Sequence, residues 1–170
     1  MSETLHLMIQ SGRRLNLLIS NLLDLTALRE HHLNLNPELC YLQPIVRSAV
    51  DLINVQFSAK NIHIENQVSE FVLPVHGDPS RIEQVLLNLL YNACKFTSEG
   101  RVQIRSATDD ESLRTEIHDS GPGVKDSDHQ LIFEAFEQEN PTLTEGLGLG
   151  LSISKEIIEE HGGQIGVEPS

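Results

Sequence analysis

The order of the apolar patterns along the 170-residue chain limits its fold more than any other feature. Residues 44–58 and 79–96 carry apolar residues at spacings of three and four, which predicts helices with one buried face. Asp78 or Ser80 is a suitable cap for the second of them. A further helix is predicted over residues 149–161. Shorter apolar stretches predict strands at residues 61–68, 71–75, 102–107, 113–118 and 164–167. Helices and strands in this order indicate an α+β fold, because they do not alternate strictly as in a parallel βαβ sheet.

The first part of the chain, residues 3–30, carries leucines at the same helical spacing, with polar residues between them. The stripe consists of Leu15, Leu18, Leu22 and Leu25. A stripe of this kind suits packing against another helix, and either the core of this chain or the seam of a dimer would bury it. The polar segment 31–37 ends this helix.

The charge of the chain excludes several classes of partner. There are 25 acidic residues against 12 Lys and Arg, so the formal net charge is −13. Such a charge repels nucleic acid and anionic membranes. An anionic ligand is therefore expected to arrive with a divalent cation. No stretch approaches the ~20 apolar residues that span a bilayer, and no signal-peptide pattern is visible. We expect a cytoplasmic piece without direct membrane contact.

The two cysteines, Cys40 and Cys94, lie far apart in the sequence and among apolar neighbours. This placement predicts buried, unpaired thiols of a reducing compartment. Neither cysteine has the spacing to a second Cys or a His that is typical of a zinc site.

The predicted helix over residues 79–96 ends in a polar group. Asn88 and Asn92 are one turn apart, so their amides point to the same side, and Lys95 lies beside them. Amide oxygens suit a hard cation such as Mg²⁺, and an ammonium suits phosphate. A solvated polar face explains the same residues equally well.

A second motif, Asp119-Ser-Gly121-Pro-Gly123, follows the strand predicted over residues 113–118. A carboxylate at the end of a strand can accept a hydrogen bond from an amino group of a ligand. The two glycines let the backbone turn tightly and approach that ligand. By itself the motif is also typical of an ordinary turn.

Two aromatic residues, Phe133 and Phe136, lie three apart in the polar segment that follows. The chain has five Phe in all, so the pair indicates an anchor for a mobile segment. A short core helix explains it equally well.

The last motif is an alternation of glycine and leucine that runs into the helix predicted over residues 149–161. It consists of Gly146, Leu147, Gly148, Leu149, Gly150 and Leu151. Glycines before a helix make room for phosphates, which favour free N–H groups and the positive end of the helix dipole. The spacing is neither that of a dinucleotide-binding fingerprint nor that of a P-loop.

Taken in this order, the four motifs resemble the nucleotide-binding boxes of the GHKL ATPase superfamily, and in particular those of sensor histidine kinases. Residues 88–97 resemble the N box, 119–124 the G1 box, 133–136 the F box and 146–151 the G2 box. Residues 78–85 are similar to the run that precedes the N box. The helix at the start of the chain resembles the second helix of the dimerisation and phosphotransfer hairpin of these kinases.

The resemblance implies a Bergerat-type two-layer sandwich, in which helices cover one face of a mixed sheet and the nucleotide lies between helices and a lid. It assigns residues 37–170 to this ATP-binding domain and residues 1–36 to the hairpin, and residues 124–147 become the lid. It further implies the cofactors ATP and Mg²⁺, with Asn92 holding the metal ion and Asn88 assisting.

The remaining site residues follow from the same resemblance. Lys95 would approach the phosphates, and Asp119 would accept the amino group of adenine. The other implied nucleotide-binding residues are Gly121, Gly123, Phe133, Phe136, Gly146, Leu147, Gly148, Leu149, Gly150 and Leu151.

The function implied is transfer of the γ-phosphate of ATP to a protein histidine, followed by relay to a response-regulator receiver domain. The parent kinase would be a dimer, and the acceptor-histidine hairpin a further partner. Hydrolytic members of the superfamily have a Glu where Asn88 stands. An amide is a poor general base, which disfavours hydrolysis. The alternative is a non-catalytic dimerisation or interaction fragment of a degenerate kinase.

Three features depart from the family pattern. None of the eight histidines has the setting of a phosphate acceptor, so this chain alone is not expected to phosphorylate itself. The strand predicted at residues 164–167 would be followed by further sheet in relatives, so we expect a truncated last strand and a piece of a longer kinase. The lid has no Lys or Arg between Lys125 and Lys155.

Overall fold

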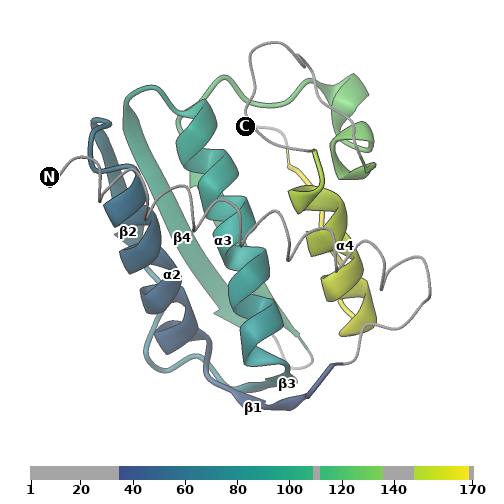
Figure 1. Ribbon diagram of the computed structural model, residues 1–170. Helices are drawn as coiled ribbons and strands as arrows, with labels where there is room; N and C mark the ends of the chain where they lie inside the picture. The colour runs from purple at the N-terminus through teal and green to yellow at the C-terminus, as the bar shows by residue number, and fades with distance from the viewer. Residues whose placement is uncertain (1–34, 109–111, 136–147, 169–170) are drawn as a thin grey trace, which may run out of the picture. The chain divides into compact units, whose positions relative to one another are not determined.

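The computed structural model describes residues 35–108, 112–135 and 148–168 of the chain (Figure 1). The chain divides into two units, residues 1–34 and residues 35–170, and all described residues belong to the second. The helix predicted over residues 3–30 lies outside the described residues. So do three of the predicted site residues, Phe136, Gly146 and Leu147.

Helices and strands follow one another in an α+β order, as predicted, apart from one unpredicted strand at the start and one predicted strand that does not form at the end. In chain order they are β1 (Glu38–Cys40), α2 (Leu42–Gln56), β2 (Ile62–Asn66), β3 (Val75–Gly77), α3 (Pro79–Phe96), β4 (Gly100–Thr108), β5 (Leu113–Asp119), the 3-10 turns η1 (Asp126–Asp128) and η2 (Leu131–Phe133), and α4 (Gly150–Glu160). Helix α3 has the predicted limits. The other helices differ from prediction by one or two residues at each end.

The larger sheet has the strand order β2-β4-β5, with β2 parallel and β5 antiparallel to β4. It is therefore a mixed sheet, as predicted. A smaller antiparallel sheet pairs β1 with β3, with Leu39 opposite His76. These two short strands lead directly into α2 and α3, so their pairing fixes where both helices begin (Figure 1).

The core lies between the helices and one face of the larger sheet (Figure 1). Val102 and Ile104 of β4 are fully buried, and strand alternation turns the intervening Gln103 to the other face. The stripes of α2 and α3 pack on them through Val46, Ala49, Val50, Ile53, Leu86, Leu90 and Ala93. The core is aliphatic, in agreement with an aromatic content of only 4%.

The opposite face of the sheet carries polar side chains that bond to one another across strands. Gln103 Nε2 donates to Glu65 Oε2 of β2 at 2.6 Å. On β5, Glu116 Oε2 lies 3.0 Å from His118 Nε2. Helices thus cover one face of the sheet, and His118 lies on the face that they leave open.

Asp78 ties the start of α3 to the end of α4. Its Oδ1 accepts hydrogen bonds from the N–H groups of Ser80 (3.0 Å) and Arg81 (3.2 Å), which caps α3. Its Oδ2 accepts the N–H of Asn36 at 3.0 Å. Its own N–H donates to Nε2 of His161, at the end of α4, at 2.9 Å. Helices α3 and α4 therefore run antiparallel, with this junction at one end of the pair (Figure 1).

Asp78 gives a prediction about stability. Burial alone would raise the pKa of this carboxyl, but the hydrogen bonds from Ser80, Asn36 and Arg81 outweigh burial and lower the pKa. We expect Asp78→Ala to reduce the free energy of unfolding at neutral pH by about 1–2 kcal/mol, as measured by urea denaturation.

The pH dependence of this effect follows from the lowered pKa. The carboxylate contributes fully above the unfolded-state pKa of about 4, and the contribution is lost as pH falls through the lower folded-state pKa. The difference in unfolding free energy between wild type and Asp78→Asn should therefore shrink below about pH 4. Asp51→Asn, at an exposed position of α2, is the control. A difference that stays constant down to acid pH would contradict this role.

Two strand predictions are wrong. The strand predicted at residues 71–75 lies instead at Val75–Gly77, because its partner is β1, a three-residue strand that no pattern predicted. Pro74 offers no N–H for a ladder, and Phe71 is 94% exposed. The stretch 164–167 forms no strand, since none of the described strands pairs with it.

The placement of the two cysteines was predicted correctly. Cys40 and Cys94 are buried and unpaired, as predicted. Among the helices in the described ranges, none is long and apolar enough to cross a membrane.

Candidate nucleotide-binding site

Asn88, a predicted metal ligand, lies in the contact between α3 and α4. Its Nδ2 donates to the carbonyl oxygen of Gly150 at 3.2 Å and to Ser154 Oγ at 3.4 Å. A Cβ added at Gly150 would lie 3.4 Å from Asn88 Cγ, so the two helices approach closely here. Asn88 is 8% exposed, which rules out a solvated face at this position. Because Nδ2 of Asn88 is hydrogen-bonded to α4, Oδ1 of the same side chain is the atom that could bind a cation.

Helix α4 begins directly beside Asn88, at the end of the glycine-rich run. Its N-cap residue, Leu149, is buried and provides no side-chain cap, in contrast to Asp78 at α3. Gly148 has φ 68°, a conformation that favours glycine. Leu149 therefore makes no side-chain cap at the start of α4, and N–H groups at a helix start together with the positive end of the dipole favour an anion.

Asp119 ends β5 and begins a tight turn. Its Oδ1 accepts the N–H of Gly121 at 2.8 Å, and the residue is exposed. A Cβ at Gly121 would lie 2.7 Å from this oxygen and 3.2 Å from the carbonyl oxygen of Phe96. The turn therefore packs on the end of α3, and it needs glycine at this position. Gly123 follows with φ 72°.

The last turn of α3 carries the remaining predicted ligands. Asn92 and Lys95 are both half-buried. Lys95 Nζ lies 5.1 Å from the centroid of the Phe96 ring, and Phe96 is 50% exposed. Sequence reasoning did not select Phe96 as a site residue. The backbone carbonyl of Phe96 lies beside Gly121 of the Asp119 turn, and a planar base could stack on its exposed ring.

The chemistry of these side chains fits a magnesium nucleotide better than a bare metal ion. The described ranges contain no group of three or more His, Cys, Asp or Glu side chains that could hold a metal ion. Asparagine oxygens suit Mg²⁺, but two of them fill only part of its six-coordinate shell. Phosphate oxygens and water would have to supply the rest.

A buried thiol, Cys94, lies between charges at the end of α3. The pKa of Cys94 is raised to about 11, chiefly by burial; the charge of Lys60 opposes the rise and that of Asp119 adds to it. Cys94 is therefore a neutral thiol, and both charged groups lie close enough to affect it.

Phe133 is buried in η2, which contacts α4. This agrees with an anchor at the F box. Its predicted partner, Phe136, and the lid residues 136–147 lie outside the described residues.

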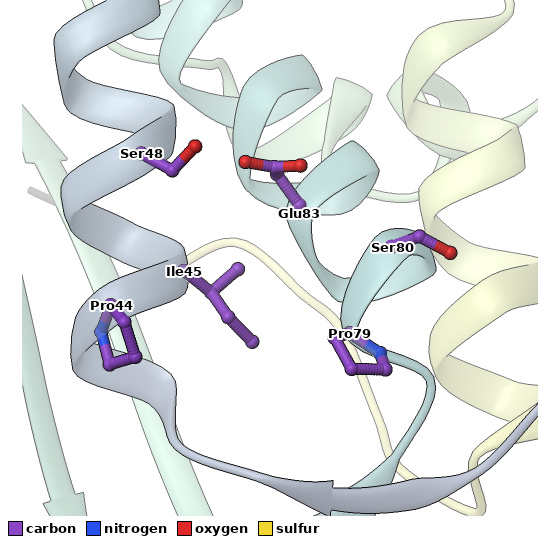
Figure 2. Close-up of a pocket in the computed structure, with 6 residues that line it drawn as sticks. All are labelled: Pro44, Ile45, Ser48, Pro79, Ser80 and Glu83. Carbon is purple, nitrogen blue, oxygen red and sulfur yellow. The ribbon is translucent and has the colours of Figure 1, made fainter.

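A hollow in the described structure lies elsewhere. It has a volume of about 370 Å³ and opens between the first turns of α2 and α3, as Figure 2 shows. Its lining residues are Pro44, Ile45, Ser48, Pro79, Ser80 and Glu83. None of them is a predicted site residue, and Asn92, Lys95 and Phe96 lie at the other end of α3.

Comparison with known families and relatives shows to which family the chain belongs. The family described as "Histidine kinase-, DNA gyrase B-, and HSP90-like ATPase" matches residues 77–170. The sensor protein GacS of Pseudomonas syringae pv. syringae is 33% identical over 168 residues, which cover 94% of this chain and 18% of GacS.

Solved structures give the same result. The crystal structure of full-length ShkA in complex with AMPPNP has a TM-score of 0.80 and 31% identity, over 95% of this chain and 34% of that chain. The histidine kinase ThkA, solved in complex with the response regulator TrrA, has a TM-score of 0.71 and 28% identity, over 91% of this chain and 45% of that one.

The chain thus spans less than half the length of these relatives. Its mixed sheet and the helical layer on one face of that sheet match those of the solved kinase structures. The chain belongs to the histidine kinase-, DNA gyrase B- and HSP90-like ATPase family, and it is the ATP-binding catalytic region of a sensor histidine kinase.

Proposed function

We propose that this region binds Mg·ATP at the meeting point of α3, α4 and the Asp119 turn, and presents the γ-phosphate to a histidine of a separate hairpin. The observation that carries the proposal is the bond from Asn88 Nδ2 to the carbonyl oxygen of Gly150 at 3.2 Å. This contact brings the amide ligands of α3 next to the uncapped start of α4. The amides of α3 would bind the Mg²⁺ ion and the start of α4 would bind the phosphates of the same nucleotide.

The adenine end of the ligand fits the Asp119 turn. Oδ1 is engaged by Gly121, which leaves Oδ2 to accept a hydrogen bond from the amino group of adenine. The exposed ring of Phe96, whose backbone carbonyl lies near Gly121, would offer a stacking surface for the base. Gly123 and the buried anchor Phe133 would shape the rest of the pocket.

The phosphate end fits the other elements. Asn92, with Asn88 Oδ1, would hold Mg²⁺, and Lys95 would contact the phosphates. The N–H groups that follow Gly148 at the start of α4 would bind phosphate oxygens. Leu149, Gly150 and Leu151 belong to the same turn, and the predicted ligands Phe136, Gly146 and Leu147 would act from the lid.

The metal gives a direct test. We expect EDTA to weaken ATP binding by at least about tenfold in calorimetric titration, because the glycine N–H groups and one lysine leave the triphosphate charge under-neutralised in a chain of net charge −13. Asn92→Ala should remove most of this dependence on Mg²⁺. Adenosine, which has no phosphates, is the control ligand, and its affinity should not respond to EDTA. Equal ATP affinity with and without EDTA would count against Asn92 as a ligand.

The amide side chain of Asn88 favours transfer of the γ-phosphate to a histidine over hydrolysis of ATP. Its Nδ2 is a hydrogen-bond donor to α4, and an amide cannot take a proton from water at neutral pH. Asn88 therefore cannot act as the general base that hydrolysis of ATP needs.

The partners follow from the same proposal. The acceptor histidine would lie on a dimerisation hairpin, whose second helix would be the one predicted over residues 3–30, and the parent kinase would be a dimer. A response-regulator receiver domain would take the phosphoryl group. Two buried, unpaired cysteines support a cytoplasmic location, where thiols stay reduced.

A further inference from the structure

The ammonium group of Lys60 donates three hydrogen bonds to backbone carbonyls at the end of α3. Lys60 lies in the loop between α2 and β2. Its Nζ donates to the carbonyl oxygens of Cys94 at 2.8 Å, Lys95 at 2.9 Å and Thr97 at 2.9 Å. An ammonium group has three donors, and here each of them has an acceptor.

These carbonyls would otherwise have no partner in the helix. The last four carbonyls of any helix lack intrahelical donors and collect the negative end of its dipole. In α3, the N–H of Thr97 closes the last bond, to the carbonyl oxygen of Ala93 at 3.0 Å. Lys60 supplies both the missing donors and a positive charge at this end. The loop after α2 therefore determines how α3 ends.

The Lys60 side chain is itself held in place. Its Nζ lies 5.5 Å from the centroid of the Phe57 ring, and this ring meets Tyr91 of α3 edge-on, with 5.4 Å between centroids. The backbone on both sides is also fixed. The N–H of Lys60 donates to Phe57 at 2.9 Å, and the carbonyl of Asn61 accepts the N–H of Gly100 at 3.0 Å. An ammonium held in this way can act as a rigid support.

The turn that Lys60 holds belongs to the candidate site. Phe96 lies within it, and the Asp119 turn rests on it through the close approach of Gly121 to the Phe96 carbonyl. Lys60 and Asp119 also act in opposite directions on the pKa of the Cys94 thiol, so both charges lie near the same buried atom. A shift of this turn would move the adenine-binding groups relative to one another.

We propose that Lys60 is a positioning residue for the nucleotide. It contacts no nucleotide atom in this proposal. It acts through the carbonyls of residues 94–97, which keep Phe96 and the Asp119 turn at the spacing that adenine requires. The inference rests on the proposed function, because it assigns Lys60 a role in the same site.

The test compares ADP and adenosine binding by the full chain in wild type, Lys60→Met, Lys60→Arg and Arg47→Met. Arg47 is an exposed cation on α2 that pairs with the exposed Glu70 at 3.6 Å, so Arg47→Met controls for the loss of one positive charge. We expect Lys60→Met to weaken the binding of both ligands by about tenfold. When the turn frays, only a fraction of the molecules keeps the binding geometry, and the apparent affinity falls in proportion to that fraction. Lys60→Arg should recover most of the affinity, since a guanidinium can donate to the same carbonyls.

Hydrogen exchange locates the change. In Lys60→Met, the amides of residues 93–97 should exchange faster, while those of residues 82–90 in the same helix keep their wild-type rates. If Lys60→Met does not fold, Lys60→Gln, which keeps a donor without the charge, takes its place in the same comparison.

Two outcomes would overturn the proposal. One is a folded Lys60→Met with unchanged affinity for both ligands. The other is weaker ADP binding with unchanged adenosine binding, which would mean that Lys60 acts only by its charge on the phosphates. A wild-type chain that binds no ADP would contradict the proposed function itself, so the two failures are distinguishable.

Discussion

Replacing Asp119 by asparagine is expected to weaken ADP binding by about a hundredfold while the fold is retained. Asp119 Oδ1 accepts the N–H of Gly121 at 2.8 Å, and the asparagine oxygen can accept the same bond, so the turn survives. The second oxygen becomes an amino group, which puts a donor opposite the amino group of adenine. Losing a hydrogen bond to a charged acceptor costs about 1.5–3 kcal/mol, and each 1.4 kcal/mol is tenfold in Kd.

Calorimetric titration of wild type, Asp119→Asn and Asp51→Asn with ADP measures this effect. Asp51 is exposed on α2, so Asp51→Asn makes the same change in net charge away from the site. It should bind ADP as the wild type does. Circular dichroism should be the same for all three proteins. An unfolded spectrum for Asp119→Asn would make Asp119 a structural residue, and unchanged ADP affinity in a folded variant would remove it from the adenine pocket.

The same variant should also lose discrimination between bases. Guanine has a carbonyl oxygen where adenine has its amino group, and the carboxylate of Asp119 repels that oxygen. The amide nitrogen of Asp119→Asn can donate to it instead. The variant should therefore bind ADP more weakly and GDP more tightly than the wild type does. As a result, the ratio of ADP affinity to GDP affinity should fall by a larger factor than the ADP affinity itself. A ratio that stays constant would indicate that Asp119 does not face the base.

Helix α3 could be predicted to the residue because its limits depend on local signals. Asp78 is a good cap, Pro79 suits the first turn, and the apolar stripe continues without interruption to Ala93. The hairpin of β4 and β5 was equally readable, since its strands are long and adjacent in sequence. Both elements owe little to distant parts of the chain.

The short strands could not be predicted for the opposite reason. Strand β1 has three residues, and its partner among the described strands, β3, begins 35 residues after it ends. Nothing within residues 38–40 distinguishes them from a loop. The neighbouring Phe71 and Leu73 look like strand residues, yet both are exposed, because strand formation depends on a partner that their own sequence does not reveal.

The site was predictable as a set of motifs but not as a set of contacts. Spacing placed Asn88 on one face of a helix, and only its contact with Gly150, 62 residues away, separates a packed amide from a solvated one. Phe96 continues the apolar stripe by spacing and is nevertheless half exposed. Lys60 gave no signal at all, since a single lysine after a helix is common and its three acceptors lie more than 30 residues away.

Incubation of this chain with γ-labelled ATP and Mg²⁺ is expected to leave the chain itself unlabelled. Phosphoryl transfer requires an acceptor nitrogen in line with the γ-phosphate, and ATP affinity cannot replace it. Both ring nitrogens of His161 are engaged, with the N–H of Asp78 and with the carbonyl oxygen of Ile157. His118 precedes Asp119 but points to the face of the sheet opposite the helices, away from the proposed phosphate end.

A hairpin supplied separately should accept the label. A dimerisation hairpin that carries an acceptor histidine is added as a separate protein, and the reaction should be slow because it is bimolecular. The label should be labile to acid and stable to base, as expected for a phosphoramidate, and Asp119→Asn should abolish it at ATP concentrations that saturate only the wild type. Acid-labile phosphate on this chain would contradict the prediction and point to His118 or His6 as an acceptor. Bound ATP without label on either protein would contradict transfer to this hairpin, and the non-catalytic alternative would then be favoured over the kinase.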